Sequence, residues 1–368
     1  MIKKTLLAIF TVVLIASCDN ELDITADWND VPVVYGILNS QDSNHYIKLN
    51  KVFLGQGDVM SMAQEFDSIH YNQDDIGLRL IEYSLQASKY IQLRTIEMEP
   101  SSDFIKPDGI FSHPDQVIYK TSETINHERF YAAEVYDKRS DLVIAKNSIP
   151  IDILSPLQVT KPNQFTPLNL VPLSYLSKAE WTSVEGGKLY ELQIRFYYVE
   201  QQITNLSDTV HKYIDWIFPY RQSTNTSGGE SMSISIDPDQ FLNFLAVNIE
   251  ENPNVYRQVS GILAAQTTSG FSITHACMDF SLLSAGEDLS TYIMLNENSN
   301  SIVLDRPEYS NIENGIGILS SRSIDIVEGI KINNDSNDEI AFNPITKHLN
   351  FAYFRFGGDN QIDTLYVN

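Results

Sequence analysis

The sequence predicts a mainly β protein of two sandwich-like domains, with one helix inserted in the second domain. Three observations support this prediction. Short apolar runs of strand length recur between turns rich in Asn, Asp, Ser and Gly. In several of these runs apolar and polar residues alternate, which is the period of a half-buried strand. Only one long segment, residues 238–251, combines helix-capping residues with the spacing of an amphipathic helix.

The composition indicates a folded protein with a strongly acidic surface. Hydrophobic residues make up 43% of the chain and aromatic residues 11%, which excludes wholesale disorder. The 368 residues are enough for two domains of ordinary size. A formal net charge of −23 repels phosphate groups, so we expect no binding of nucleic acid.

The first 18 residues have the pattern of an export signal. Lys3 and Lys4 precede an apolar run that is too short to span a bilayer stably. The run ends in Ile-Ala-Ser-Cys, which resembles the lipobox of bacterial lipoproteins, where the cysteine is acylated and the segment before it is removed. We therefore expect residues 1–17 to be a lipoprotein signal peptide and Cys18 to be the lipidation site. The alternative is an ordinary signal peptide with a chance cysteine.

Residues 18–30 are then a lipidated acidic tether. Residues 19–30 read DNELDITADWND and contain five acids and no base. The segment resembles the acidic signal that directs Bacteroidota lipoproteins to the cell surface. In enteric-type sorting, Asp19 beside the cysteine would instead indicate retention at the inner membrane. We expect a lipid-anchored outer-membrane protein that faces outward.

Residues 31–154 are predicted to form an N-terminal β-sandwich domain. The apolar run 33–38 and the alternating run 46–53 flank a polar turn, which predicts a hairpin. Pro150 and Pro156 mark a boundary, so we close the domain at residue 154.

A later strand of the same domain has a recognisable pattern. Tyr131, Ala133 and Val135 share one face of the run 130–136. This Tyr-x-Ala-x-Val strand resembles the penultimate strand of immunoglobulin-like and fibronectin type III sandwiches.

Residues 155–368 are predicted to form a C-terminal β-sandwich-like domain with a helical insertion. Trp181 precedes a turn and then the strongest strand pattern in the chain, in which five apolar residues alternate with polar ones. This order again resembles a fibronectin-type sandwich and implies that Trp181 is a core anchor. The alternating apolar residues are Tyr190, Leu192, Ile194, Phe196 and Tyr198.

The predicted helix at 238–251 has a start signal and a stop signal. Asp237 can cap it, Pro238 suits the first helical position, and Gln240 completes a spacing similar to a capping box. Phe241 and Leu245 then fall on one face, and Asn-Pro at 252–253 ends the helix.

Four blocks of sequence resemble an uncharacterised, domain-of-unknown-function family of Bacteroidota outer-membrane lipoproteins. The blocks are VPVVYGILN, LVPLSYLSKAEW, GGKLYELQIRFYYVE and, at 306–323, RPEYSNIENGIGILSSRS. The resemblance implies the location and the two-sandwich architecture, and it suggests a TonB-dependent outer-membrane transporter as the partner. None of the blocks is a catalytic signature.

Residues that could carry chemistry have simple structural explanations. Cys277 and His275 lie two apart on a predicted strand, and we interpret Cys277 as a buried thiol rather than a nucleophile. The polar cluster at 67–75, with its single His70, could bind a metal but also fits a solvated loop. Residues 333–339 have the oxygen density of a calcium loop but fit a turn equally well. We predict no catalytic residue, no metal site and no cofactor.

An aromatic segment is the best candidate for an interaction site. Trp216, Tyr220 and Arg221 are of the residue types that dominate interface hot spots, and a polar loop at 222–230 follows them. The alternative is that Trp216 and Phe218 are core residues of a strand.

These observations favour a protein that is not an enzyme. We expect a lipid-anchored surface protein that acts as a non-enzymatic binding or accessory subunit, with the membrane and an outer-membrane barrel as its partners. The first alternative is a surface adhesin or structural lipoprotein. The second is a surface hydrolase, which would need a deep pocket with close carboxylates of perturbed pKa. The oligomeric state stays open.

Overall fold

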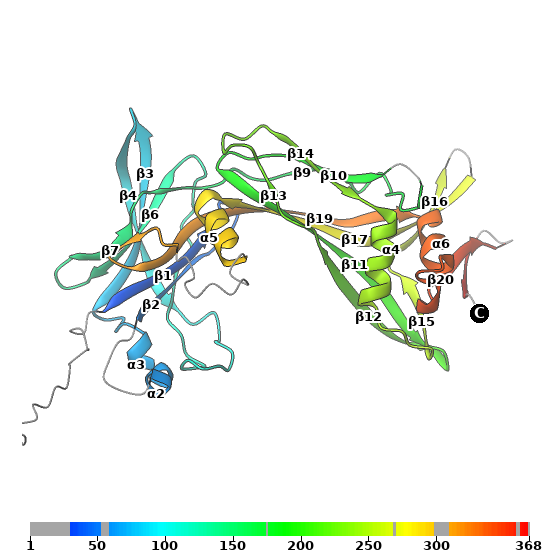
Figure 1. Cartoon of the computed structure of the whole chain (residues 1–368), viewed down its shortest axis with the longest axis horizontal. Helices are drawn as coiled ribbons and strands as arrows, with labels where there is room; N and C mark the ends of the chain where they lie inside the picture. Colours follow the sequence, from blue (N-terminus) through cyan, green and yellow to red (C-terminus); the bar gives the residue numbers. More distant parts are fainter. Residues whose placement is uncertain are drawn as a thin grey trace, which may run out of the picture.

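The fold is mainly β, as the sequence predicts, and its large sheets are sandwich-like. In the computed structural model, strands account for 53% of the residues and helices for 14%. The structure describes residues 30–52, 59–173, 176–267, 270–297, 309–357 and 361–366. The molecule is elongated, with an N-terminal and a C-terminal lobe joined by long strands (Figure 1). Within these ranges no helix has the length and apolar character needed to cross a bilayer.

The N-terminal lobe has two layers of antiparallel strands. One layer has the order β1-β2-β5-β4 and the other the order β3-β6-β7. Strand β4 pairs with β3 along most of its length and with β5 at Glu99–Ser101, so it passes from one layer to the other. The lobe contains β1 (Val31–Leu38), β2 (His45–Val52), β3 (Ile76–Gln86), β4 (Lys89–Ser101), β5 (Ile118–Thr121), β6 (Phe130–Asp137), β7 (Val143–Asn147), β8 (Ile151–Asp152) and the short helices α2 (Val59–Gln64) and α3 (Phe66–Ile69).

The alternation seen in the sequence explains the core of this lobe. Ile47 and Leu49 of β2 are buried, and they face Tyr131, Ala133 and Val135 of β6 in one hydrophobic cluster. The predicted strands at 46–53 and 130–136 are thereby confirmed over β2 and β6.

The C-terminal lobe also has two facing sheets. A three-stranded sheet has the order β14-β10-β9, and the other sheet has the order β12-β11-β17-β19. The strands are β9 (Val159–Lys161), β10 (Ser177–Thr182), β11 (Gly187–Gln202), β12 (Asn205–Ile217), β14 (Ser231–Ile236), β17 (Gly270–Gly286) and β19 (Ile316–Asn333).

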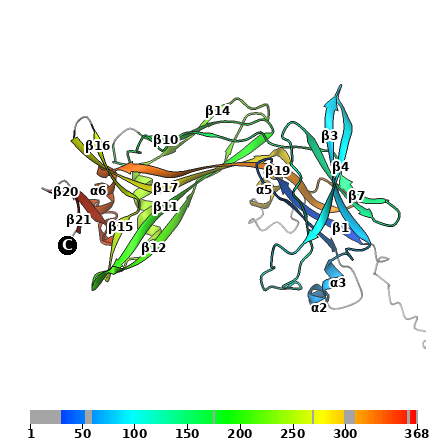
Figure 2. The same ribbon diagram turned by 180° about the vertical axis from the view of Figure 1, so that it is seen from behind.

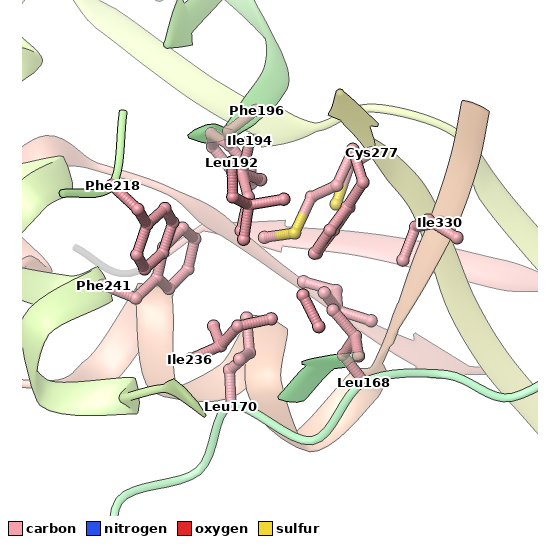
Figure 3. Close-up of a cluster of buried hydrophobic side chains, with 14 of the residues drawn as sticks. Leu168, Leu170, Leu192, Ile194, Phe196, Phe218, Ile236, Phe241, Cys277 and Ile330 are labelled. Carbon is pink, nitrogen blue, oxygen red and sulfur yellow. The ribbon is translucent and has the colours of Figure 1, made fainter. Parts of the chain in front are cut away.

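Apolar side chains fill the space between these two sheets (Figure 3). All five alternating residues of β11 predicted to face the core are buried. Trp181 of β10 is 1% exposed and packs 5.9 Å from the ring of Tyr190, so its role as a core anchor is confirmed. Figure 3 labels Leu168, Leu170, Leu192, Ile194, Phe196, Phe218, Ile236, Phe241, Cys277 and Ile330 of this core.

Strand β19 belongs to both lobes (Figures 1 and 2). Its first residues pair in parallel with β1, from Val33 opposite Ile316 to Leu38 opposite Ser321. Its remaining residues pair in antiparallel with β17. Leu319 therefore joins the hydrophobic cluster of the N-terminal lobe, although it lies far along the chain.

Among the described residues, three α-helices lie in the C-terminal half, where the sequence predicted one. The predicted helix is confirmed as α4 (Pro238–Asn248), with the Asp237 side chain accepting a hydrogen bond from the Gln240 N–H at 3.0 Å. The expectation of a single helix is wrong, because α5 (Glu287–Glu297) and α6 (Asn334–Phe342) are also present. In both helices the apolar residues form a buried face only through tertiary packing: Leu289 packs with Ile318, and Ile340 joins the C-terminal core.

Short elements complete the C-terminal half. They are β13 (Arg221–Gln222), β15 (Val255–Val259), β16 (Ile262–Thr267), β18 (Ile312–Glu313), β20 (Ala352–Phe356), β21 (Ile362–Tyr366) and a 3₁₀ turn at Lys347–Leu349.

Candidate functional site

The aromatic segment 213–221 lies along the end of β12 and just beyond it. Trp216 points toward the core, where its ring lies 4.4 Å from that of Phe218 and 5.4 Å from that of Phe244. Tyr220 is half-buried and packs in a separate cluster beside α5, and Arg221 is exposed. The structure therefore does not bring the three predicted interaction residues onto one surface. Whether they bind a partner stays a prediction.

The opposite face of the same strands carries an ordered set of polar and aromatic side chains. Arg195 donates two hydrogen bonds to Asp215, from Nε to Oδ1 at 2.7 Å and from Nη2 to Oδ2 at 2.9 Å. The guanidinium lies 4.1 Å from the centre of the Tyr213 ring. The Tyr197 hydroxyl donates to Asp279 Oδ2 at 2.7 Å. We name this set the ladder face: Arg195, Tyr197, Tyr213, Asp215 and Asp279.

Strand pairing explains why these residues meet. Arg195 of β11 lies between Asp215 of β12 and Asp279 of β17, and Tyr197 lies opposite Tyr213. Because side chains alternate along a strand, the neighbours of these residues in the sequence fill the core. The ladder face is consequently supported by a packed layer directly beneath it.

The ladder face stays charged at neutral pH. The two hydrogen bonds from Arg195 lower the pKa of the Asp215 carboxyl, and the same bonds raise the pKa of the Arg195 guanidinium. Burial, and then the hydrogen bond to Asp279, raise the pKa of the Tyr197 hydroxyl. A two-bond pair of this kind fixes both side chains in one geometry.

A groove of about 590 Å³ lies beside the ladder face, toward α5. Its wall includes Glu191, Ile217, Pro219, Tyr220 and Met294. Ile217 is 59% exposed although it is large and apolar. Together the ladder face and the groove form a continuous surface with a charged part and an apolar part.

A second candidate is a cavity of about 420 Å³ at the junction of the lobes. Asp152 enters it from β8, Asp288 from α5, Tyr309 from the segment before β18, and Tyr90 from β4. Burial, and then the charges of Glu185, Asp288 and Glu287, raise the pKa of the Asp152 carboxyl. The Tyr309 hydroxyl donates a hydrogen bond to Asp288 Oδ1. A carboxyl of raised pKa beside further acids can hold a proton that it later donates.

The other chemistry-bearing residues have structural roles. Cys277 is fully buried in the C-terminal core, and burial raises the pKa of its thiol (Figure 3). His275 Nε2 lies 3.4 Å from Asn334 Oδ1, and the ring packs against Phe354. A thiol held neutral in this way is a poor nucleophile.

The segments 67–75 and 333–339, which could bind metal ions by their composition, contain local hydrogen bonds. Residues 334–339 begin α6, and the Asn333 side chain caps this helix by accepting from the Ser336 N–H. His70 is buried, and its Nδ1 lies 3.1 Å from the Phe66 carbonyl oxygen. The described ranges contain no group of three or more His, Cys, Asp or Glu side chains that could hold a metal ion.

The ladder face is not apparent when residues 213–221 are considered as a single aromatic segment. The signal was the two-residue period: Ile214 and Trp216 fall on one face, and Tyr213, Asp215 and Ile217 on the other. Cys18, the predicted lipidation site, lies outside the described residues, as do the signal peptide and nearly all of the tether.

Comparisons with known proteins give no family and a solved structure of low similarity. No protein-family model matches this chain, and no curated protein matches it. Among solved structures, the chain is similar to the C-terminal globular domain of an oligosaccharyltransferase from Pyrococcus abyssi, at 9% identity and a TM-score of 0.17. The similarity covers 82% of this chain and 48% of the other, so this chain spans about half the length of that structure. A TM-score this low carries no argument about fold or function.

Proposed function

We propose that this protein is a lipid-anchored subunit of the outer-membrane surface that binds a protein partner and does not catalyse a reaction. The lipobox at Cys18 and the acidic tether support the location. The ladder face is the observation that carries the binding role. The family resemblance favours a TonB-dependent transporter as the partner, with nutrient capture as the shared task.

The ladder face has the properties of an interface hot spot. Tyr and Arg are enriched at such sites because they offer large, stiff contact surfaces with a polar end. Here the Arg195–Asp215 pair and the Tyr197–Asp279 hydrogen bond hold the side chains in place before a partner arrives. Less side-chain entropy is then lost on binding. The exposed Ile217 beside them supplies the apolar contact.

We propose further that both lobes are immunoglobulin-like or fibronectin type III-like sandwiches. In the C-terminal lobe, three strands in the order β9-β10-β14 face four in the order β12-β11-β17-β19. These orders correspond to the A-B-E and C′-C-F-G sheets of a fibronectin-type domain, with α4, β15 and β16 inserted before strand F. In the N-terminal lobe, the Tyr131 hydroxyl accepts a hydrogen bond from the Asn126 N–H at 2.9 Å, which is the arrangement of a tyrosine corner.

The binding role can be tested in the native outer membrane. We expect affinity purification after gentle detergent extraction to recover a barrel protein in near-equal amount. The double variant Tyr213→Ala/Ile217→Ala should reduce this recovery at least about tenfold, since truncation of two hot-spot residues costs about 2 kcal/mol or more. Ile105→Ala is the matched control, because Ile105 is 80% exposed in the N-terminal lobe, between β4 and β5, and lies outside the ladder face and the groove.

Two results would contradict the proposal. Recovery of the lipoprotein without a barrel protein would favour an adhesin or structural role. Full recovery with the double variant would exclude the ladder face as the contact. The Cys18→Ala variant tests location separately: it should lose incorporation of an acyl label, while its binding face is unchanged.

A surface hydrolase is a second candidate, and the junction cavity favours it. The raised pKa of Asp152 suits a proton donor, and Glu287 and Asp288 line the same cavity. Turnover of a surface glycan by the wild type, with loss of turnover in Asp152→Asn, would establish this role. Binding to a barrel partner without turnover would leave the first proposal in place.

A further inference from the structure

Strand β12 is the free edge of the sheet in the C-terminal lobe. It pairs with β11 on one side, and among the described strands no other pairs with it on its outer side. Figures 1 and 2 both show it at the margin of the lobe, with no described element beyond it. An edge strand presents a row of backbone donors and acceptors that can pair with another strand.

The edge lacks most of the features that prevent such pairing. It is 13 residues long and contains neither Pro nor Gly. Its pairing with β11 is regular from Thr209 to Ile217, and the register shifts just before this part, where Gln202 lies opposite Asn205. Val210 and Leu206 are 51% and 46% exposed despite their apolar side chains. Natural sheets usually protect a long apolar edge of this kind.

The sequence of β12 is complementary to itself. When two copies lie antiparallel about a two-fold axis at Val210, Asp208 of each copy lies opposite Lys212 of the other. Leu206 lies opposite Ile214, and Val210 opposite itself. Opposite charges in such cross-strand pairs are stabilising, and the symmetry forms each pair twice.

Neighbouring registers lose this complementarity. A slip that centres the axis on Thr209 places Lys212 opposite Leu206, and one that centres it on His211 places Asp208 opposite Ile214. Pairing of odd with even positions would join the core face of one copy to the ladder face of the other. The register centred on Val210 is therefore favoured both by the opposite charges of Asp208 and Lys212 and by the matching of the strand faces.

We propose that this protein forms a two-fold dimer through antiparallel pairing of β12 with β12 of a second copy, centred on Val210. The two four-stranded sheets then become one continuous eight-stranded sheet. Both ladder faces lie on the same side of it, because a two-fold axis perpendicular to the sheet preserves its faces. Lys212, which contacts Glu200 at 2.6 Å within its own chain, gains Asp208 of the second copy as a further partner.

Charge reversal followed by mixing tests the register directly. In Asp208→Lys, position 208 and Lys212 repel each other across the axis; in Lys212→Glu, position 212 and Asp208 do so. Each variant alone should dimerise about tenfold or more weakly than the wild type, since two attractive pairs become repulsive. An equimolar mixture should recover dimers of one copy of each, because every cross-strand pair is then complementary again.

The measurement is sedimentation of the full chain in detergent at about 0.15 M salt, which screens repulsion between two chains of net charge −23. Lys89→Glu is the control, because it makes the same charge change as Lys212→Glu at an exposed residue of the N-terminal lobe and should leave the dimer intact.

Val210→Lys should give monomers, because it places two ammonium groups at the axis. A wild type that stays monomeric up to about 100 µM would overturn the proposal. So would variant mixtures that dimerise no better than either variant alone.

Discussion

At the scale of single residues, burial decides which side chains are chemically available. Cys277 and His275 lie two residues apart in the sequence, and both are buried in the core, where burial raises the pKa of the thiol and lowers the pKa of the imidazole. Asp152 has a different position, because it lines a cavity and meets three other acids there. Its titration can therefore be observed in solution.

Asp152→Asn should stabilise the protein at neutral pH. Burial and the neighbouring acids raise the folded-state pKa of Asp152 above its ordinary value of 3.8, so the ionised form costs stability above the raised pKa. That cost decreases as the pH falls through the raised pKa and disappears below 3.8, where both states bind the proton. We expect the melting temperature at pH 7 to rise by about 1–3 °C, a small effect because water screens a partly exposed group.

Thermal melting of both proteins between pH 3.5 and pH 8 checks this expectation. Asp74→Asn is the control, because Asp74 is an exposed acid on the N-terminal lobe and lies outside the junction cavity. An equal gain at low and neutral pH would contradict the account, because titration of the carboxyl could not then be the cause.

At the scale of elements, α4 shows how a local signal and tertiary packing act together. The Asp237 cap and Pro238 at the first turn define where the helix begins. Phe241, Leu242 and Leu245 are buried against the core of the C-terminal lobe. The Phe241 ring lies 5.5 Å from that of Phe196, so the helix is held on the sheet by aromatic contact.

Asp237→Ala should destabilise the protein by about 1 kcal/mol, because the Gln240 N–H loses its acceptor. In thermal unfolding this corresponds to a fall of roughly 2–4 °C in melting temperature. Asp239→Ala, in the first turn of the same helix, is the matched control and should cost less, because that side chain does not cap the helix. If the two variants were equally destabilised, general charge near the helix start would explain the effect and the cap would not.

At the scale of the whole molecule, β19 links the two lobes, because it pairs with β1 in one and with β17 in the other. Gly317 has a φ of +115°, and a Cβ placed there would lie 2.0 Å from the Val34 carbonyl oxygen. The parallel contact of β1 with β19 therefore requires glycine at this position. Ile318 and Leu289 pack at the same junction, so strand pairing and apolar contact support each other.

Gly317→Ala should separate β1 from β19 and cost about 3 kcal/mol, since both strain and a backbone clash are introduced. We expect calorimetry to show one transition for the wild type and an earlier, separate transition of the N-terminal lobe for the variant. Gly329→Ala is the matched control on the same strand, because its φ is +66° but a Cβ would meet nothing within 4 Å. It should cost only about 1 kcal/mol and keep a single transition. Similar melting curves for the two variants would show that the pairing of β1 with β19 does not couple the two lobes.

Much of the local structure follows from the sequence by itself. The two-residue alternation along β11 determines which side chains are buried, because a strand places successive residues on opposite faces. Asp237, Pro238 and Gln240 determine the start of α4, because a helix start needs acceptors for its free N–H groups. Trp181 was recognisable as a core anchor from its place before that strand. In each case the cause lies within a few residues.

Only the tertiary structure decided the features that join distant residues. The ladder face needs Arg195, Asp215 and Asp279 on three adjacent strands, and no local pattern states which strands are neighbours. The pairing of β1 with β19 joins residues almost 300 positions apart, and the apolar faces of α5 and α6 become visible only where those helices pack. Strand order and lobe contacts depend on the packing of the whole chain, because short-range propensities carry no information about which buried faces meet.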